Sequence, residues 1–443
     1  MINIVLLSGG SGKRLWPLSN ETMSKQFLRL LRNENGEKES MVQRVFRQIK
    51  ETGIEANILI TTGKSQVESI RSQLGNDCDV VVEPERRNTF PAIMLAAAYL
   101  KYEKKIAAED TVLVLPVDPY AENSYFETLL KMDEAIQSDR SDMTLMGIEP
   151  TYPSEKYGYI VCERSDDKVK KVLRFQEKPD LATAKKLLEE GAYWNAGVFG
   201  FKLKYITDIL DKNIKVNSYE ELHSHFSDLK KDSFDYEVVE KADSICMVPY
   251  KGEWKDLGTW NTLSEEMPAN HGNVITGEEN ENVTVVNVTD RPVVVLGLKD
   301  AVVVSSSEGI LVSDKHKSSY LKPYVENLNV DRPMYERKRW GEYKVLDDQV
   351  FPDGTKVLTK HLMMEKGKSI SYQLHHHRDE IWTVIDGEAK MILDGVCSIV
   401  HRGDVIKVSK EMKHKLTALS DFHFIETQIG DQLVEEDIER LEE

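Results

Sequence analysis

Short, continuously apolar runs alternate with helical patterns over the first 270 residues, and this alternation limits the possible folds more than any other feature of the chain. The apolar runs predict strands at 3–8, 57–62, 79–84, 111–118 and 143–148. Amphipathic or alanine-rich stretches between them predict helices at 40–53, 65–75, 91–105 and 125–136. Strands that are apolar throughout are typical of a mostly parallel sheet covered by helices on both faces. We therefore predict an α/β, Rossmann-like domain whose ligands bind at the carboxyl ends of the strands.

The first predicted strand leads into a glycine-rich segment, SGGSGKRLWPLS. It does not fit a Walker A loop, because Arg14 stands where Ser or Thr is needed, and it does not fit a dinucleotide loop, because Leu15 stands at the third glycine position. The backbone N–H groups suited to bind an anion belong to Gly9, Gly10, Ser11 and Gly12. The cations Lys13 and Arg14 follow them. Taken alone, the segment is equally compatible with a tight glycine turn and solvated charges.

The charge balance narrows the kinds of partner. The chain has 75 acidic and 58 basic residues and a formal net charge of -17, which argues against a surface for nucleic acid or an anionic membrane. A polyanionic substrate then needs a local group of cations, which Lys13, Arg14 and Lys25 supply. The four cysteines are widely separated, and we find neither a signal-peptide profile nor a membrane-length apolar run. These features predict a cytoplasmic protein with reduced thiols.

At 443 residues the chain is expected to form two or three domains. We predict an α/β domain at 1–268, because the composition changes at its end. Short β runs separated by turns predict a small β domain, a partial β-helix, at 269–325. A third domain of many short strands is predicted at 340–443, with the final segment VEEDIERLEE as a short acidic helix.

Polar side chains follow several predicted strands of the first domain. Lys25 comes soon enough after the glycine-rich segment to reach the same anion. Asp118 ends the run LVLPVD, where its carboxylate either binds Mg²⁺ or caps a turn or helix. Glu177 and Lys178 place an acceptor beside a cation, which suits sugar hydroxyls and a phosphate. The glycine-rich segment and residues 83–89 and 115–119 all follow strands, so we expect them to border one crevice.

Several motifs occur in order along the chain: GGSGKRLWPLS, SKQFL, EPERRNTFPAI, GIEPTYPSEKYGYI, FQEKPD, WNAGVF, SFDYEVVEKA and WKDLGTW. Together they resemble the mannose-1-phosphate guanylyltransferase (GDP-mannose pyrophosphorylase) family of nucleotidyltransferases, in its bifunctional form with a phosphomannose isomerase-like cupin domain. The resemblance implies that GTP and mannose 1-phosphate react to GDP-mannose and pyrophosphate. The sugar phosphate is the nucleophile in this reaction, so catalysis consists of aligning two polyanions and stabilising charge on the phosphates.

The resemblance also implies roles for individual residues. The implied catalytic residues are Arg14, Lys25, Asp118 and Asp256, and the two aspartates hold Mg²⁺. The implied nucleotide-binding residues are Gly9, Gly10, Ser11, Gly12, Lys13, Glu83, Asn88 and Thr89. The implied sugar-phosphate-binding residues are Gly158, Glu177, Lys178 and Asn195.

The sequence departs from the family pattern near the expected substrate pockets. Lys13 stands where the family usually has Thr or a similar residue, and Phe90 stands where it has Ala. Val117-Asp118-Pro119 replaces the usual Ala-Asp-His. The alternatives left open are another NTP, or another sugar 1-phosphate such as that of glucose or a heptose. A non-catalytic sensor or scaffold is the alternative from a different class.

A histidine-rich segment, QLHHHRDEIW, marks the third domain. On a strand Gln373 and His375 point to the same face, Glu380 follows five residues after His375, and His414 lies eleven residues after Gly403. This spacing resembles the two motifs of the cupin β-barrel. We expect Gln373, His375, Glu380 and His414 to hold Zn²⁺ or another divalent metal. The simpler interpretation is a solvent-facing histidine cluster in a loop.

In the bifunctional members of the family the cupin interconverts fructose 6-phosphate and mannose 6-phosphate. Here Ile381 replaces a His, Lys415 replaces an Arg, and Ser409-Lys410-Glu411 replaces a Pro-x-Gly turn. Arg and Lys are not equivalent at a planar phosphate contact. The isomerase activity therefore stays open against a cupin that only modulates the first domain or stabilises a homodimer, which is the oligomeric state we expect.

Overall fold

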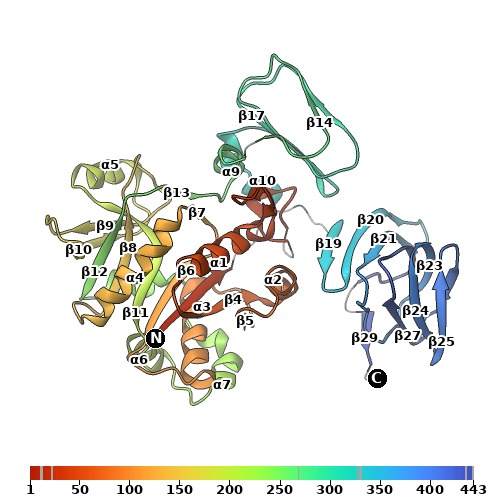
Figure 1. Cartoon of the computed structure of the whole chain (residues 1–443), viewed down its shortest axis with the longest axis horizontal. Helices are drawn as coiled ribbons and strands as arrows, with labels where there is room; N and C mark the ends of the chain where they lie inside the picture. Colours follow the sequence, from red (N-terminus) through yellow and green to blue (C-terminus); the bar gives the residue numbers. More distant parts are fainter. Residues whose placement is uncertain are drawn as a thin grey trace. The chain divides into compact units, whose positions relative to one another are not determined.

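The computed structural model describes residues 1–9, 13–20, 23–267, 269–326, 328, 332–434 and 437–441. The chain divides into two compact units (Figure 1). The first comprises Met1–Leu15, Ser24–Ala269 and Lys315–Tyr320, and the second comprises Trp16–Met23, Asn270–Asp314 and Leu321–Glu443. The domain boundaries predicted from the sequence stay a prediction.

A nine-stranded sheet forms the centre of the first unit. Its strands are β1 (Ile2–Ser8), β4 (Ala56–Gly63), β5 (Asp79–Glu83), β6 (Thr111–Pro116), β8 (Met143–Ile148), β9 (Tyr159–Cys162), β10 (Lys170–Gln176), β11 (Tyr193–Lys202) and β12 (Ile245–Tyr250). Their order is β5-β4-β1-β6-β11-β8-β12-β10-β9. Strands β5, β4, β1 and β6 pair in parallel, as do β8 and β12, while β11 runs antiparallel between β6 and β8. All five predicted strands are present, and the α/β fold class is confirmed.

Helices cover both faces of this sheet (Figure 1). The helices of this unit are α1 (Met41–Glu51), α2 (Val67–Leu74), α3 (Thr89–Ala98), α4 (Asn123–Gln137), α5 (Leu181–Glu189), α6 (Leu203–Asn213), α7 (Tyr219–Ser224), α8 (Phe234–Glu237) and α9 (Trp260–Glu265). The four predicted helices correspond to α1, α2, α3 and α4. Ser40 is the N-cap of α1 and forms a capping box with Gln43. Helix α3 is apolar on every side because it packs between the sheet and helices α6, α7 and α8.

The predicted 91–105 helix changes character part-way along its length. The α-helical part ends at Ala98, and a π-helical turn, Tyr99–Glu103, follows it.

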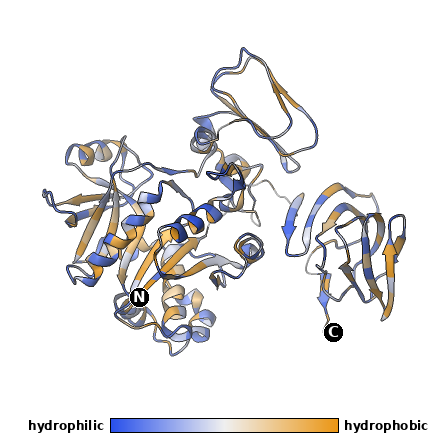
Figure 2. Cartoon of the chain, viewed as in Figure 1, coloured by the Kyte–Doolittle hydropathy of each residue, from blue (hydrophilic) through white to orange (hydrophobic). Residues whose placement is uncertain are grey.

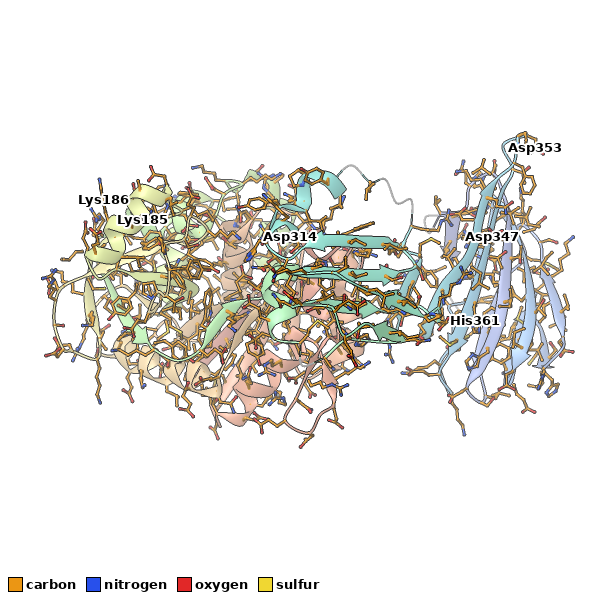
Figure 3. All side chains as sticks on the ribbon, turned by 90° about the horizontal axis from the view of Figure 1, so that it is seen from above. Lys185, Lys186, Asp314, Asp347, Asp353 and His361 are labelled. Atoms are coloured by element: carbon orange, nitrogen blue, oxygen red, sulfur yellow. The ribbon has the colours of Figure 1, made fainter. Side chains whose placement is uncertain are left out.

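Outward faces of the unit are polar, as α5 illustrates, where Lys185 and Lys186 extend away from the sheet (Figure 3). Apolar residues concentrate on the strands of the central sheet (Figure 2). Within the described residues, no helix combines the length and apolar character needed to cross a membrane.

Short parallel strands follow in the second unit. Its first strands are β14 (Val274–Thr276), β15 (Thr284–Asn287), β16 (Val293–Val295), β17 (Ala301–Ser306) and β18 (Gly309–Asp314). β14 pairs with β16 in parallel and β15 pairs with β17 in parallel, so alternate strands stack as the rungs of a small β-helix. Val285, Val295 and Val303 form its small core. A short helix, α10 (Lys322–Val325), comes next.

Two antiparallel sheets form the C-terminal cupin. Their strands are β19 (Tyr335–Lys338), β20 (Gly341–Val350), β21 (Lys356–Met364), β22 (Gln373–His375), β23 (Arg378–Asp386), β24 (Glu388–Leu393), β25 (Val396–His401), β26 (Val405–Val408), β27 (His414–Ala418), β28 (Phe422–Gly430) and β29 (Ile438–Arg440). The sheet orders are β19-β20-β21-β28-β23-β26 and β25-β24-β27-β22-β29. A core that includes Trp382, Phe422 and Phe424 lies between them. The hairpin between β20 and β21 extends to Asp353 in solvent (Figure 3).

The acidic helix predicted for the tail is wrong over the described residues. Residues Ile438–Arg440 form strand β29, which pairs antiparallel with β22. The carboxylate of Asp437 fixes the start of this strand by accepting from the backbone N–H groups of His376 and His377 at 3.0 and 3.1 Å. This tertiary pairing outweighs the helical propensity of a Glu-rich segment.

Candidate functional site

Two three-residue strands bring the predicted catalytic carboxylates together. Strand β7 (Pro119–Ala121) follows Asp118 directly, and it pairs antiparallel with β13 (Trp254–Asp256), with Pro119 opposite Asp256. The lysine of the short 3₁₀ segment Lys25–Phe27 reaches both acids: its Nζ lies 2.5 Å from Asp118 Oδ2 and 3.6 Å from Asp256 Oδ1. The ammonium of Lys25 thus lies between two carboxylates, one just after the parallel strand β6 and the other at the end of β13.

The two neighbouring carboxylates keep the ammonium of Lys25 in its charged form. Burial acts to lower the pKa of Lys25 and Arg14 lowers it further, but the charges of Asp118 and Asp256 outweigh both and raise it above its ordinary value. A glycine leaves room for the group, since a Cβ on Gly258 would lie 2.8 Å from Asp256 Oδ1 and 3.2 Å from Lys25 Nζ.

A buried network of amides and hydroxyls fixes the segment that carries Lys25. Gln66 donates to Ser24 Oγ at 2.7 Å and accepts from Gln26 Nε2 at 3.3 Å, so it holds the residues on both sides of Lys25. Thr62 Oγ1 also donates to Gln66, at 3.0 Å, and Gln26 reaches Ser8 Oγ at 3.1 Å. All five of these residues are buried. The network ties the lysine segment to the ends of β1 and β4.

We predict that Gln66→Leu lowers the turnover number about tenfold without removing any group that touches substrate. The variant removes one hydrogen-bond partner from each of Ser24, Gln26 and Thr62, which also lowers the free energy of unfolding by about 1–3 kcal/mol. Asn3→Leu is the control, because Asn3 is a buried amide at the opposite end of β1 that bonds Thr111 O. Turnover and unfolding are measured for both variants. If both variants lost stability and had the same turnover number as each other, a positioning role for Gln66 would be contradicted.

The glycine-rich segment lies partly outside the described residues. Gly10, Ser11 and Gly12 are not among the described residues, so their predicted contacts with nucleotide stay a prediction. Lys13 and Arg14 begin a short 3₁₀ turn directly after them, Lys13–Leu15. Arg14 is exposed and close enough to Lys25 to affect its pKa.

A pocket of about 190 Å³ joins the carboxylate pair to most of the predicted sugar site. Its lining includes Asp118, Asp256, Gly158, Glu177 and Asn195. The backbone N–H of Asn195 donates to Gly158 O at 2.8 Å, which links two of these residues. Gly158 allows close packing here, because a Cβ would lie 2.5 Å from Glu177 Oε2 and 2.8 Å from Phe175 Cζ.

Two further groups complete this pocket. Lys178 lies beside it, with Nζ 2.5 Å from Glu177 Oε1. Tyr157 and Trp254 line the pocket with their rings 5.4 Å apart, and Trp194 packs against Tyr157 at 5.0 Å. Asp235, which the sequence analysis did not select, also lines the pocket.

The predicted base-binding residues lie outside this pocket lining. Asn88 takes a left-handed conformation (φ 75°) and caps α3 by accepting from Thr89 N. Thr89 Oγ1 accepts from Phe234 N at 2.9 Å, which connects the start of α3 to α8. Glu83 ends β5 and is buried. The structure therefore brings the two carboxylates together with Gly158, Glu177 and Asn195 in one pocket, and the predicted base-binding residues lie at and after the end of β5.

Burial raises the pKa of Glu83 to about 7. The folded chain then holds a proton that the unfolded chain loses near pH 4.5, so wild-type stability falls as the pH rises between these values. We predict that Glu83→Gln changes the free energy of unfolding little at pH 5 and increases it by up to about 3 kcal/mol at pH 8. Denaturant unfolding of both proteins at the two pH values measures this. A difference that does not vary with pH would contradict it.

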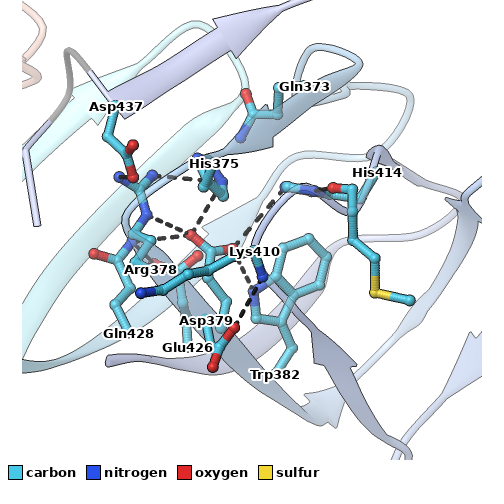
Figure 4. Close-up of polar contacts among 12 residues, drawn as sticks. Gln373, His375, Arg378, Asp379, Trp382, Lys410, His414, Glu426, Gln428 and Asp437 are labelled. Atoms are coloured by element: carbon cyan, nitrogen blue, oxygen red, sulfur yellow. Dashed lines mark hydrogen bonds and ion pairs between the residues drawn. The ribbon is translucent and has the colours of Figure 1, made fainter. Parts of the chain in front are cut away.

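The cupin brings a buried group of metal-ligand type together from three strands (Figure 4). One ligand atom from each of His375, Glu380 and His414 lies within 4.8 Å of the others. His414 donates from Nδ1 to Met412 O at 3.0 Å, which leaves the lone pair of Nε2 directed towards Glu380 Oε2, 4.0 Å away. The interpretation as an exposed loop cluster is wrong for His375, which is 1 % exposed; His376 is exposed and His377 is half-buried.

The donor set fits a divalent cation. His375 Nδ1 and His414 Nε2 are buried without a hydrogen-bond partner among the described residues, which is costly unless a ligand binds there. Burial lowers the pKa of His375 to about 4, so its imidazole is neutral and able to bind a metal. Gln373 stands opposite His414 in the β22–β27 pairing, and its Oε1 accepts from Ser371 at 2.8 Å.

A buried arginine beside this group was not predicted. Arg378 Nε donates to Glu380 Oε1 at 2.9 Å, and its Nη1 reaches Asp437 Oδ2 at 3.3 Å. Burial acts to raise the pKa of Glu380, but the charge and the hydrogen bond of the Arg378 guanidinium help to keep it below its ordinary value. Arg378 follows three histidines and matches no metal-ligand pattern, so the sequence gives it no separate signal. Asp437 lies in the segment that was expected to be helical.

The sheet with a lysine between two strand-end carboxylates, followed by a cupin, is the architecture of a nucleotide-sugar-forming transferase. Residues 3–271 match the nucleotidyl transferase family model, and residues 326–443 match that of the mannose-6-phosphate isomerase C-terminal domain. The chain belongs to the nucleotidyl transferase family, and within it to the mannose-1-phosphate guanylyltransferases that carry this C-terminal domain.

Individual relatives match along almost their whole length. The mannose-1-phosphate guanylyltransferase of Escherichia coli K12 is 30% identical, over 99% of this chain and 97% of the relative. The alginate biosynthesis protein AlgA of Pseudomonas aeruginosa is 29% identical, over 99% and 96%. A crystal structure from Thermus thermophilus, described as mannose-1-phosphate geranyltransferase, has a TM-score of 0.61 and 27% identity, covering 74% of this chain and 99% of that one. The family resemblance predicted from the motifs is confirmed.

Proposed function

We propose that the chain forms GDP-mannose and pyrophosphate from GTP and mannose 1-phosphate. The observation that carries this proposal is the contact of Lys25 with both Asp118 and Asp256, because these two acids line the same pocket as Gly158, Glu177 and Asn195. Relatives with the same two-part organisation carry the name of this activity.

The residues present suit a reaction without a protein nucleophile. The phosphate oxygen of the sugar 1-phosphate attacks the α-phosphorus of the nucleotide, and pyrophosphate leaves. Lys25 and Arg14, with the backbone N–H groups of Gly9–Gly12, would bind the triphosphate and stabilise the charge that develops on it. Lys13 adds a further cation near this position. The pocket aligns the sugar phosphate for in-line attack.

Asp118 and Asp256 fit a hard divalent cation. Their carboxylate oxygens already share one cationic partner, the ammonium of Lys25, and oxygen ligands from one or two carboxylates are what Mg²⁺ uses at phosphate-transfer sites. Bound Mg²⁺ would neutralise charge on the nucleotide phosphates. Lys25 would then move its contact from the carboxylates towards the phosphates.

Substrate recognition is assigned to two groups of residues. We assign the sugar phosphate to Gly158, Glu177, Lys178 and Asn195, which lie in or beside the pocket. We assign the base to Glu83, Asn88 and Thr89, which follow the end of β5. The homodimer and the cytoplasmic location stay predictions from the sequence.

The buried group of the cupin supports a second candidate function. His375, Glu380 and His414, with Gln373 beside them, would hold Zn²⁺ or another borderline divalent metal. When bound, such a metal polarises a sugar carbonyl, which is the chemistry of a mannose 6-phosphate isomerase. The opposing proposal is a non-catalytic cupin, favoured by Ile381, Lys415 and the missing Pro-x-Gly turn.

A screen of four NTPs against a panel of sugar 1-phosphates, with Mg²⁺, tests the main proposal. We expect pyrophosphate release only when all three components are present, with GTP and mannose 1-phosphate as the best pair. If the enzyme preferred a glucose or heptose 1-phosphate, that sugar would replace mannose 1-phosphate as the assigned substrate. No release from any pair would overturn the reaction itself.

A further inference from the structure

Several acids and one cation, Lys156, line the pocket, and the predicted site residues leave out one of these acids. Besides Glu177, the carboxylate of Asp235 lines it. Lys178, the cation beside Glu177, is engaged with Glu177 Oε1 at 2.5 Å. A ligand portion that lies between two carboxylates must donate hydrogen bonds without carrying negative charge, which describes the hydroxyl groups of a sugar ring.

Asp235 is oriented towards the pocket by a residue already assigned to the sugar. Asn195 Nδ2 donates to Asp235 Oδ1 at 2.7 Å, and Asn195 Oδ1 accepts from Gly197 N at 3.1 Å. Both polar atoms of the Asn195 side-chain amide are therefore engaged, one with Asp235 and the other with the backbone of Gly197. On Oδ2 of Asp235 the structure shows no side-chain donor from the residues it describes.

The short helix that carries Asp235 is fixed on its other side. Phe234 is fully buried and packs against Phe199 and Phe201 at centroid distances of 4.9 and 5.9 Å. Its backbone N–H donates to Thr89 Oγ1 at 2.9 Å, and Phe90 N donates to Asp232 O at 3.2 Å. Helix α8 therefore presents Asp235 to the pocket from a rigid position.

The raised pKa of Asp235 is consistent with a carboxylate that has room for a further hydrogen-bond donor. Burial and the neighbouring carboxylate of Glu177 raise the pKa of Asp235 to about 7, so the side chain lacks the full set of partners that would stabilise its charge. Hydroxyl donors of a ligand would supply them.

We propose that Asp235 is a further sugar-binding residue that helps set sugar specificity, its carboxylate accepting hydrogen bonds from ring hydroxyls of the sugar 1-phosphate; this rests on the proposed function. Its motif, SFDYEVVEKA, belongs to the family resemblance, but the motif alone gave this acid no role.

The test uses Asp235→Asn in the full chain, because an asparagine oxygen still accepts from Asn195 and preserves the shape of the side chain. We expect the KM for mannose 1-phosphate to rise about tenfold or more and the preference over glucose 1-phosphate to fall, with the KM for GTP within about twofold of wild type. Glu237→Gln is the matched control. Glu237 lies on the same helix, where it pairs with Lys230 and Lys241 and is absent from the pocket lining.

A binding measurement separates this inference from the proposed function. Calorimetry with GDP-mannose and with GDP should show that Asp235→Asn weakens only the nucleotide sugar. An unchanged affinity for GDP-mannose, or equal weakening of both ligands, would overturn the role of Asp235 even if the wild type is active. Absence of turnover in the wild type would overturn the proposed function, while the binding comparison still decides the role of Asp235.

Discussion

Replacing Asp118 by asparagine is expected to lower kcat/KM for pyrophosphate release about a thousandfold, which corresponds to about 4 kcal/mol of transition-state stabilisation. The carboxylate of Asp118 lies 2.5 Å from Lys25 Nζ, and the β7–β13 pairing places the next residue, Pro119, opposite Asp256. An amide keeps the shape but loses the charge that binds a divalent cation and orients Lys25. Initial rates over a range of Mg²⁺ concentrations measure the effect.

Two variants make this result specific. Asp139→Asn removes an exposed acid of the same unit, at a left-handed position that asparagine tolerates, and is expected to change the rate less than about twofold. Asp256→Asn removes the partner carboxylate, which is more exposed and contacts Lys25 at 3.6 Å, and should lose activity as Asp118→Asn does. Retention of more than a tenth of the activity in either site variant would contradict the proposed carboxylate pair.

Replacing His375 by alanine is expected to remove a bound divalent metal from the cupin. His375 is buried with one ring nitrogen unpartnered, and its other nitrogen lies 3.2 Å from Glu380. Loss of one of few ligands should weaken metal binding by about a hundredfold or more. After dialysis, elemental analysis should therefore find about one metal ion per wild-type chain and less than about a tenth of that in the variant.

The neighbouring histidine provides the matched control. His376 is exposed and pairs with Glu411 and Glu439, so His376→Ala should retain its metal. Nucleotidyl transfer should be unaffected in both variants, since the catalytic residues belong to the other unit. Equal metal loss from the two variants would show that the metal binds the surface histidines instead of the buried group.

The sequence predicts the strand framework of the first unit well, because buried parallel strands are apolar along their whole length. It also places Asp118 and Glu83 correctly at strand ends. It does not predict β7 and β13, which are three residues long and pair across a large separation along the chain. Only the family resemblance connected Asp256 with Asp118.

Residues whose role depends on contacts with distant segments were harder to predict. Gln66 and Asp235 stand in ordinary polar surroundings in the sequence, and their importance comes from contacts with distant segments. The tail shows the same limit, because the partner of β29 is β22, and local helical propensity carries no information about that pairing.

The most direct test of the account is identification of the product formed from GTP, mannose 1-phosphate and Mg²⁺ by the full chain. We predict one GDP-mannose for each pyrophosphate released, detected by mass spectrometry and a phosphate assay, and no product when any component is omitted. Pyrophosphate release without a nucleotide sugar, or no release at all, would contradict the assignment of this pocket to nucleotidyl transfer.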